Sequence, residues 1–223
     1  MTIEGPDGAG KTSQAQRLRE RLQAGGHQVL LTREPGGTAV GEQIRRILLD
    51  PTVGHLDPAT DALLFNAARA RLVREVIRPA LERGDVVIST RFADSTIAYQ
   101  GYGAGLPLAD LESMAELATE GLAPDLTILL DLPVEIGLSR KSGHEVTRFE
   151  TEFDVDFHRR VRDGFLAIAA AQPQRFVVVD ATRSEAEVAG AIGEAVDGLL
   201  GLDPVASEHR SGEPRTAPER IQT

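Results

Sequence analysis

The feature that most constrains this chain is a glycine-rich loop close to its start. Residues 5–12 read Gly-Pro-Asp-Gly-Ala-Gly-Lys-Thr and fit the pattern G-x-x-x-x-G-K-[ST]. In such a loop the backbone N–H groups surround phosphate oxygens, the lysine reaches the outer phosphates, and the threonine hydroxyl ligates Mg²⁺. Residues 1–4 can form a strand and residues 11–24 a helix, a context that a plain glycine-rich turn lacks. The sequence therefore predicts a nucleoside triphosphate site formed by Gly5, Pro6, Asp7, Gly8, Ala9, Gly10, Lys11 and Thr12.

The composition restricts the classes of function. The chain has 223 residues, a formal charge of −10, 41% hydrophobic residues and no cysteine. It is long enough for one domain with a sizeable core. The acidic charge argues against a broad nucleic-acid surface, and the lack of cysteine excludes disulfides, thiol catalysis and zinc–thiolate sites. Neither a signal peptide nor an apolar run of membrane-spanning length is present, so we expect a cytoplasmic protein that binds neither nucleic acid nor membrane.

Five short apolar runs alternate with segments of helical periodicity. The runs cover residues 1–4, 28–32, 86–90, 126–131 and 176–180. They are apolar throughout rather than alternating, which is typical of strands covered on both faces, so the pattern predicts a parallel α/β sheet flanked by helices. Helices are expected at residues 11–24, 40–48, 58–81, 108–122, 134–141, 152–171 and 184–199. Pro79 should distort the last turn of the third helix.

Three segments depart from this pattern. Residues 142–147 lack apolar periodicity, and we expect a mobile flap there, within a lid at about residues 140–149. The end of the chain is rich in Pro, Ser, Glu and Arg, so we expect a domain over residues 1–200 and a disordered tail over residues 201–223. The first strand has only about four residues, so either the chain begins upstream or this strand is abbreviated.

Five further blocks narrow the nucleotide that binds. They are residues 32–38 (Thr-Arg-Glu-Pro-Gly-Gly-Thr), 64–69 (Leu-Phe-Asn-Ala-Ala-Arg), 91–101 (Arg-Phe-Ala-Asp-Ser-Thr-Ile-Ala-Tyr-Gln-Gly), 131–133 (Asp-Leu-Pro) and 148–150 (Arg-Phe-Glu). With the phosphate loop, and in this order, they closely resemble bacterial thymidylate kinases as far as about residue 200. The first and third blocks are highly specific to that family, whereas the phosphate loop alone leaves many functions open.

The resemblance implies transfer of a phosphoryl group from MgATP to dTMP, which gives dTDP and ADP. It also implies the three-layer fold of the P-loop nucleoside monophosphate kinases, with a five-stranded parallel sheet and helices on both faces. The expected cofactor is Mg²⁺, the expected small-molecule partners are ATP and dTMP, and the expected assembly is a homodimer. Apolar positions on the third predicted helix can serve either a dimer interface or the core.

The resemblance assigns the dTMP site to Asp7, Arg45, Phe65, Arg69, Arg91, Ser95, Thr96, Tyr99 and Gln100. Arg91 and Arg45 would hold the phosphate, a role that suits a guanidinium group with paired donors. Tyr99 would crowd the 2′ position of the sugar, and Asp7 would accept from its 3′-hydroxyl. The alternative for Tyr99 is simple packing between helix and sheet. Arg91 also follows a predicted central strand, where ligands of open α/β sheets bind.

Four of these residues would recognise the base. Phe65 would stack on the thymine ring, and Arg69 would donate to a pyrimidine carbonyl. Thr96 and Gln100 would hydrogen-bond other edges of the base. Without the resemblance, Phe65 reads as a core residue. Arg69 likewise reads as part of a solvated helix face that it shares with Arg71, Arg74 and Arg78.

Catalysis by such an enzyme depends on in-line alignment of the phosphoryl donor and acceptor and on neutralising the charge of the group that is transferred. The variable positions of the phosphate loop contain no arginine, so the resemblance is to the class that supplies a cation from the lid. We predict Lys11, Arg91 and Arg140 as catalytic residues, with Lys141 and Arg148 as second choices for the lid cation. The alternative for Arg140 is a solvent-facing basic helix end, since cations favour helix C-termini.

Thr90 departs from the family pattern, which has Asp before the arginine of the third strand. The lost carboxylate predicts weaker Mg²⁺ affinity rather than an inactive enzyme.

Other functions compete with this interpretation. A kinase for another pyrimidine nucleotide is the nearest, because a single methyl group separates thymine from uracil. A nucleotide-binding regulator without catalysis is a second, suggested by Thr90 and the short first strand. A phosphate-loop ATPase acting on protein or nucleic acid is a third, and the acidic charge argues against it.

Overall fold

The five predicted strands form one parallel sheet. The computed structural model describes residues 1–141, 147–149 and 153–202. The strand order is β2-β3-β1-β4-β5, and every pair is parallel. The bounds are β1 (Thr2–Glu4), β2 (Val29–Arg33), β3 (Val86–Thr90), β4 (Thr127–Asp131) and β5 (Phe176–Asp180). These agree with the predicted runs to within one residue at each end, which confirms the α/β fold and the five-stranded sheet.

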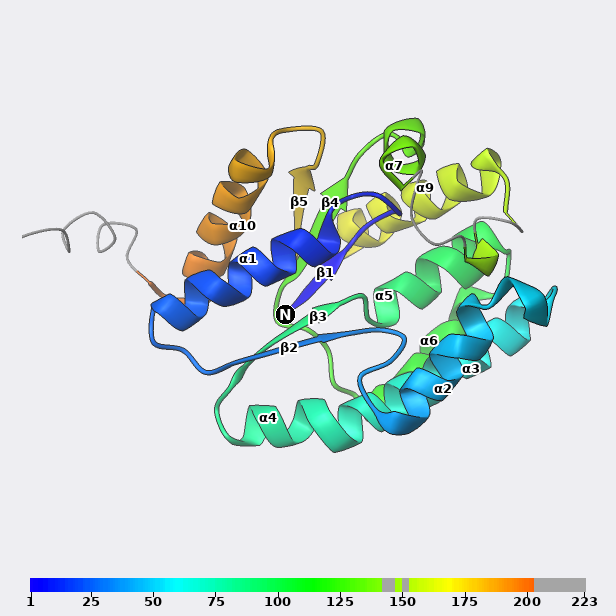
Figure 1. Cartoon of the computed structure of the whole chain (residues 1–223), viewed down its shortest axis with the longest axis horizontal. Coiled ribbons are helices and arrows are strands. Elements are labelled where there is room, and N and C mark those ends of the chain that lie inside the picture. Colours follow the sequence, from blue (N-terminus) through cyan, green and yellow to red (C-terminus); the bar gives the residue numbers. More distant parts are fainter. Residues whose placement is uncertain (142–146, 150–152, 203–223) are drawn as a thin grey trace, which may run out of the picture.

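The short strand β1 lies at the centre of this sheet (Figure 1). Ile3 is opposite Thr90 of β3 on one side and Ile128 of β4 on the other. Because β1 leads directly into the phosphate loop, the loop emerges at the middle of the edge where the parallel strands end. This is the edge at which ligands of such sheets bind.

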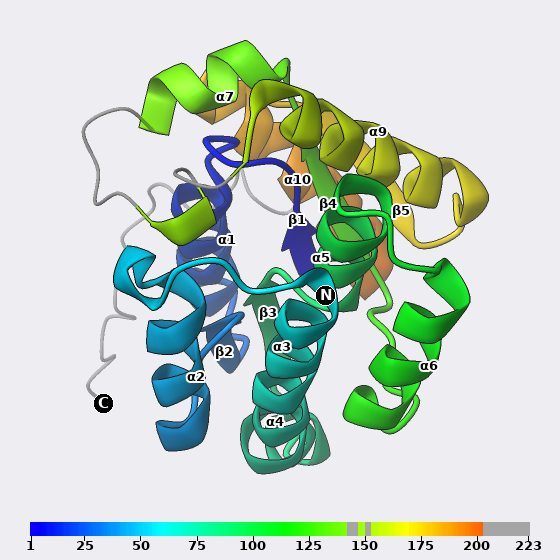
Figure 2. The same ribbon diagram turned by 90° about the vertical axis from the view of Figure 1, so that its right-hand side faces the viewer.

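Helices cover both faces of the sheet and make three layers. On one face lie α1 (Lys11–Ala24) and α10 (Glu185–Leu200), whose Leu18, Leu22 and Ile192 pack against Ile3 and Ile128. The other face is covered by α3 (Pro58–Leu72) and α9 (Val155–Ala171), in two further apolar clusters. In Figure 2 this second layer faces the viewer, in front of the sheet. Within the described residues, no helix combines the length and apolar character needed to cross a membrane.

The third predicted helix is interrupted, and the interruption is larger than we expected. After α3 the backbone widens into a π-helical turn, η2 (Val73–Ile77), before α4 (Arg78–Glu82) continues. Pro79 has no backbone N–H, and its ring crowds the carbonyl four residues earlier, so a regular α-helix cannot run through this point. The prediction of a distortion confined to the last turn was therefore wrong. The widened turn begins before the proline.

The segment after β3 is helical, which the sequence did not indicate. It forms α5 (Ala93–Thr96) and a π-helical stretch, η3 (Ile97–Gly103), packed tightly on α9. A Cβ on Gly103 would lie 2.8 Å from Phe157, and one on Gly164 would lie 2.6 Å from Tyr102. These two glycines let the backbones approach, so η3 is fixed by α9 rather than by its own helical propensity.

The remaining described elements complete the outer layer. They are α2 (Ala39–Leu49), the 3₁₀ turn η1 (Pro51–Val53), α6 (Leu108–Thr119) and α7 (Val134–Lys141). The predicted flap, except for Thr147, lies outside the described residues, and so does the predicted tail from residue 203 onward.

Candidate active site

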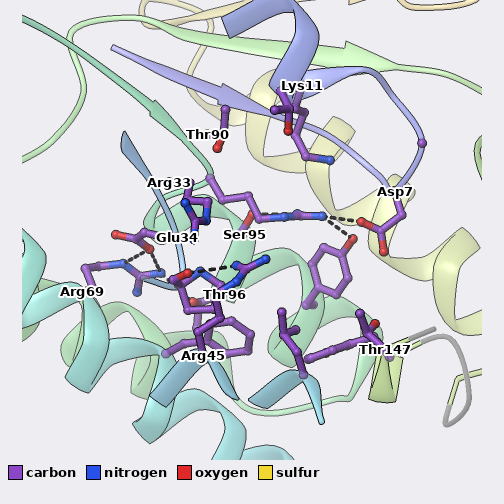
Figure 3. Close-up of a pocket in the computed structure, with 18 of the residues that line it drawn as sticks. Asp7, Lys11, Arg33, Glu34, Arg45, Arg69, Thr90, Ser95, Thr96 and Thr147 are labelled. Carbon is purple, nitrogen blue, oxygen red and sulfur yellow. Dashed lines mark hydrogen bonds and ion pairs between the residues drawn. The ribbon is translucent and has the colours of Figure 1, made fainter. Parts of the chain in front are cut away.

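One cavity opens where the strands end. Its volume is about 400 Å³, and the loops after β1, β2 and β3 converge on it (Figure 3). All nine residues of the predicted dTMP site line it: Asp7, Arg45, Phe65, Arg69, Arg91, Ser95, Thr96, Tyr99 and Gln100. From the phosphate loop, Gly8, Gly10, Lys11 and Thr12 line it as well. Residues spread over almost a hundred positions of the chain therefore share one space.

The phosphate loop takes its shape from its glycines. Gly5 has φ 138° and Gly8 has φ 75°, values that L side chains rarely adopt. A Cβ on Gly5 would also lie 2.4 Å from the carbonyl oxygen of Leu130 in β4. Helix α1 begins after Gly10, and no side chain of the described residues caps its first turn. The amides of that turn are therefore open to an anion, which suits a phosphate.

Lys11 lies along the inside of this loop. Its Nζ donates to the carbonyl oxygens of Gly5 at 2.9 Å and Pro6 at 2.8 Å. Thr12 follows on the helix and exposes its side chain at the cavity. The lysine charge and the threonine hydroxyl are thus both present where the motif requires them.

The phosphate loop touches helix α7 backbone to backbone. A Cβ on Gly8 would lie 2.0 Å from the carbonyl oxygen of Gly137, and a Cβ on Gly137 would lie 2.3 Å from the carbonyl oxygen of Asp7. Neither position has room for a side chain. Helix α7, which leads into the predicted lid at about residues 140–149, is therefore in direct contact with the loop.

Arg91 is the centre of a polar cluster beside the loop. Its Nη2 donates to Asp7 Oδ1 at 2.6 Å and to the Tyr99 hydroxyl at 3.1 Å, and its Nη1 donates to Ser95 Oγ at 3.1 Å. We call Asp7, Arg91, Ser95 and Tyr99 the Arg91 cluster. Burial lowers the pKa of Arg91, but the Tyr99 oxygen, Asp7 and Glu4 together raise it above its ordinary value. The guanidinium therefore stays charged, and the pairing of Asp7 with it was not anticipated from the sequence.

Two more arginines face the same space. Arg45 Nη1 donates to the carbonyl oxygen of Pro35 at 3.0 Å, and Arg33 pairs with Glu42 at the rim. Burial lowers the pKa of Arg45, and the charges of Arg33 and Arg91 lower it further. The guanidinium groups of Arg33, Arg45 and Arg91 repel one another, so an anion bound between them would stabilise all three. Their paired N–H donors match the oxygens of a phosphate.

Arg69 forms a second cluster on another wall of the cavity. Its side chain is 1% exposed and is paired with Glu34, which is 3% exposed. Its Nε donates to Glu34 Oε2 at 2.9 Å, its Nη1 to Asn66 Oδ1 at 2.7 Å, and its Nη2 to Thr96 Oγ1 at 2.9 Å. We call Glu34, Asn66, Arg69 and Thr96 the Arg69 cluster. Burial raises the pKa of Glu34, and the charge of Arg69 opposes that rise.

This cluster presents donors to the cavity. The Thr96 oxygen already accepts from Arg69, so its O–H is left to donate to a ligand.

The alternative that Arg69 belongs to a solvated helix face is wrong, but it fits the neighbouring arginines. Arg71 pairs with Glu75 at the surface. Arg74 and Arg78 pair at the surface with Glu120.

Aromatic rings form a third wall. Phe65 lies 6.0 Å from Phe149 between ring centroids, and Tyr99 lies 6.2 Å from the same ring. Phe65 is only partly buried and lines the cavity, so it is not simply a core residue. The side chain of Gln100 makes no hydrogen bond to any other described residue, so its amide is available to the edge of a base.

Two of the three candidates for the lid cation have described side chains, and both lie apart from this cavity. Arg140 is exposed at the end of α7, and its Nη1 donates to the carbonyl oxygen of Ala181 at 3.0 Å, beyond the lining residues. Arg148 is 2% exposed and forms an ion pair with Asp61, while its Nε donates to the carbonyl oxygen of Leu48 at 3.1 Å. The choice of Arg148 as a lid cation was wrong, because its guanidinium is committed to buried partners. Of Lys141 only the backbone is described.

The cavity offers few protein ligands for a metal. Thr12 and Thr90 contribute hydroxyl groups to its lining. The described residues contain no group of three or more His, Cys, Asp or Glu side chains that could hold an ion. Mg²⁺ keeps waters and takes substrate phosphates as ligands. These residues therefore fit a metal that arrives with ATP, and do not fit one held by the protein alone.

Some lining residues had no role assigned from the sequence. Arg33 is the last residue of β2 and Glu34 follows it, while Thr147 and Phe149 flank Arg148. A polar pair directly after an apolar run was the available signal for the first two. The second two are brought to the cavity by folding across the chain. Phe149 lies in the Arg-Phe-Glu block, but no local pattern assigned a role to either residue.

Comparison with known proteins agrees with this geometry. Residues 3–192 match the family model described as thymidylate kinase. A thymidylate kinase of Deinococcus radiodurans is 52% identical over 196 residues, which cover 88% of this chain and 95% of that relative. One of Pseudomonas fluorescens is 49% identical over 201 residues, covering 90% and 95%. The crystal structure of thymidylate kinase from Ehrlichia chaffeensis has a TM-score of 0.70 and 34% identity, covering 87% of this chain and 96% of that one. The chain belongs to the thymidylate kinase family.

Proposed function

We propose that this chain transfers the γ-phosphoryl group of ATP to dTMP, which yields dTDP and ADP. The observation that carries this proposal is the shared cavity, in which a phosphate loop faces three arginines, an aromatic wall and a set of donors for a base. An oxygen of the dTMP phosphate forms the new bond to the γ-phosphorus, and the bond from that phosphorus to the β-phosphate oxygen breaks. A phosphate is largely ionised at neutral pH, so no general base is needed.

Each part of the cavity has a distinct task in this proposal. Lys11 and the loop amides bind the phosphates of ATP. Arg91 and Arg45 bind the phosphate of dTMP, and Arg91 exchanges its contact with Asp7 for that phosphate. The exchange is supported by the position of this ion pair at the cavity, where both side chains are partly exposed, 18% and 16%. Catalysis then follows from in-line alignment of donor and acceptor.

One residue of the Arg69 cluster and two other lining residues recognise the base. Thr96 of the cluster donates to a carbonyl oxygen, Gln100 offers both a donor and an acceptor, and Phe65 stacks on the ring. We assign this carbonyl to C4 of the base. Thymine and uracil carry a carbonyl oxygen there, whereas cytosine carries an amino group. The proposal therefore includes rejection of dCMP and weak turnover of dUMP.

We further propose that Mg²⁺ accompanies ATP and takes the Thr12 hydroxyl as a ligand. Bound there, the ion neutralises charge on the phosphates. Arg140 is proposed as the cation that acts on the transferring group. For that role its guanidinium must leave the carbonyl oxygen of Ala181.

A homodimer is the proposed assembly, and its support is apolar surface. Ile47 on α2, Leu63 on α3 and Leu117 on α6 are 44%, 57% and 82% exposed. These helices are neighbours, since α3 contacts both α2 and α6. Sedimentation of the purified chain tests the assembly, and a monomer at micromolar concentration would contradict it. The cytoplasmic location stays a prediction.

The activity is tested by steady-state ADP release with MgATP and dTMP, with dUMP, UMP, dCMP and AMP run in parallel. We expect turnover selective for dTMP. Lys11→Ala is the matched control, and its turnover should fall by about 10²–10³-fold. Binding of ATP without turnover of any monophosphate would favour the regulator instead.

A further inference from the structure

Glu4 is a buried carboxylate that no role in the preceding account uses. It is the last residue of β1 and is 0% exposed. One oxygen accepts from the backbone N–H of Phe92 at 2.6 Å, and the other accepts from Ser95 Oγ at 2.6 Å. Burying a carboxylate is costly unless its hydrogen bonds are made. Both bonds of Glu4 go to the segment that carries Arg91.

The first of these bonds holds the turn at Arg91. This residue has φ 70°, a left-handed backbone that non-glycine residues rarely adopt. Such a conformation persists only where its surroundings enforce it. Phe92, the next residue, is the N-cap of α5, and its backbone N–H donates to Glu4. Glu4 thus fixes the backbone immediately after Arg91.

The second bond sets the direction of the Arg91 side chain. An ionised carboxylate can only accept, so the Ser95 hydroxyl must direct its hydrogen at Glu4. The lone pairs of Ser95 Oγ are then free to accept from Arg91 Nη1, at 3.1 Å. If the group at position 4 could itself donate, the Ser95 hydrogen would turn away and compete with that contact. The charge on Glu4 is therefore relayed to Arg91.

We propose that Glu4 is a positioning residue that presets Arg91 for the phosphate of the acceptor nucleotide, through Ser95 and the backbone of Phe92. This inference rests on the proposed function, in which Arg91 binds that phosphate. Glu4 itself does not line the cavity, so it acts through its neighbours rather than on the substrate. Its loss should weaken binding of dTMP and leave binding of ATP almost unchanged.

The charges around Glu4 place its titration in an accessible range. Burial raises its pKa to about 7, and the nearby Asp94 raises it too, while Ser95, Arg91 and Phe92 oppose the rise. Asp94 is itself held by Arg175 in two hydrogen bonds of 2.8 Å. Wild-type Glu4 is therefore largely ionised at about pH 8.5 and largely protonated at about pH 6. Glu4→Gln mimics the protonated form at every pH.

The experiment compares the KM values for dTMP and ATP, together with kcat, in wild type, Glu4→Gln, Ser95→Ala and the double variant. At about pH 8.5 we expect Glu4→Gln to raise the KM for dTMP about tenfold, since a charge-assisted contact is lost. The KM for ATP should stay within about twofold. Ser95→Ala removes one of the two links between Glu4 and Arg91, so the loss in the double variant should be smaller than the sum of the two single losses in free energy.

The pH profile adds a readout that a purely structural role would not move. The phosphate of dTMP titrates near pH 6, so the ratio of the two KM values, Glu4→Gln over wild type, is used to remove its influence. That ratio should fall toward one as the pH drops from about 8.5 to about 6. The KM for ATP is the internal control, and its ratio, Glu4→Gln over wild type, should stay close to one over the same pH range.

Stability separates this role from simple unfolding. The pKa of Glu4 is about 7 in the folded chain against 4.5 for a free glutamate, so the folded state binds more protons between these values. Its contribution to stability therefore falls as the pH rises through that window, and Glu4→Gln should be no less stable than wild type at about pH 8.5.

Three results would overturn the proposal: equal increases in the KM values for dTMP and ATP, a ratio that does not change with pH, or additive losses in the double variant. A wild-type enzyme that fails to turn over dTMP would instead reject the proposed function, so the two failures are distinguishable.

Discussion

Two arginine clusters line the same cavity, and they differ in how far water reaches them. The Arg69 side chain is 1% exposed and donates to partners on three separate segments. The Arg91 side chain is 18% exposed, and its acidic partner belongs to the phosphate loop. Removing one member of a buried pair leaves an uncompensated charge, whereas a partly exposed pair is screened by water. One arginine therefore maintains the shape of the cavity, and the other is free to exchange its partner for a substrate.

The largest effect that this contrast predicts is on stability. Arg69→Ala leaves Glu34 buried and unpaired, so we expect the free energy of unfolding to fall by about 3–5 kcal/mol. Urea unfolding followed by circular dichroism measures it. The double variant Arg69→Met with Glu34→Leu is the control and should recover much of the loss. A single variant within about 1 kcal/mol of wild type would remove the distinction between the clusters.

Arg91→Ala should show the opposite balance. We expect kcat/KM for dTMP to fall by about 10²–10³-fold, because the acceptor phosphate loses its main cation. The free energy of unfolding should change by less than about 1.5 kcal/mol, since both partners of the ion pair are partly exposed. Coupled ADP-release assays and urea unfolding of the same preparation give both values. A loss of stability as large as that of Arg69→Ala would mean that both arginines serve the fold.

Arg140→Ala tests whether a cation outside both clusters takes part. We expect kcat to fall about tenfold or more, with a much smaller change in the KM for dTMP. Arg159→Ala is the matched control, because Arg159 is also exposed and pairs with Glu135 on the same helix α7. If the Arg140 variant keeps kcat within about twofold of wild type, the assignment of this residue is wrong.

The smallest expected effect concerns the residue before Arg91. Thr90→Asp adds a carboxylate at the end of β3, and we expect the Mg²⁺ concentration for half-maximal rate to fall by about threefold to tenfold. Titration of Mg²⁺ at fixed ATP measures it. Asparagine has nearly the same shape as aspartate but carries no charge, so Thr90→Asn should have the same Mg²⁺ requirement as wild type. An unchanged Mg²⁺ requirement in the aspartate variant would show that the charge at this position is irrelevant.

Much of the fold could be predicted because its signals are local. The predicted apolar runs have the same bounds as β3 and β5. Helices α1 and α7 also begin and end at the residues predicted from the helical pattern. The cavity was predictable in outline for the same reason. A phosphate loop after β1 and polar blocks after β2 and β3 must meet, because parallel strands end at one edge.

Apart from the widened turn near Pro79, the errors arise from contacts between distant parts of the chain. Arg148 is buried because Asp61, 87 positions earlier, neutralises it, and no local pattern reveals such a partner. The helical form of η3 depends on Gly164 of α9, which admits Tyr102. Glu4 looked like an ordinary end of a strand. Its importance depends on the segment around Phe92, which folds back over it.

The contact between Gly8 and Gly137 has a mechanical consequence. The two backbones meet without any side chain between them, so a displacement of either segment is transmitted directly to the other. Substitutions that truncate side chains cannot test this contact between Gly8 and Gly137, because neither residue has a side chain to remove. Only a substitution that adds atoms, such as Gly137→Ala, acts on it.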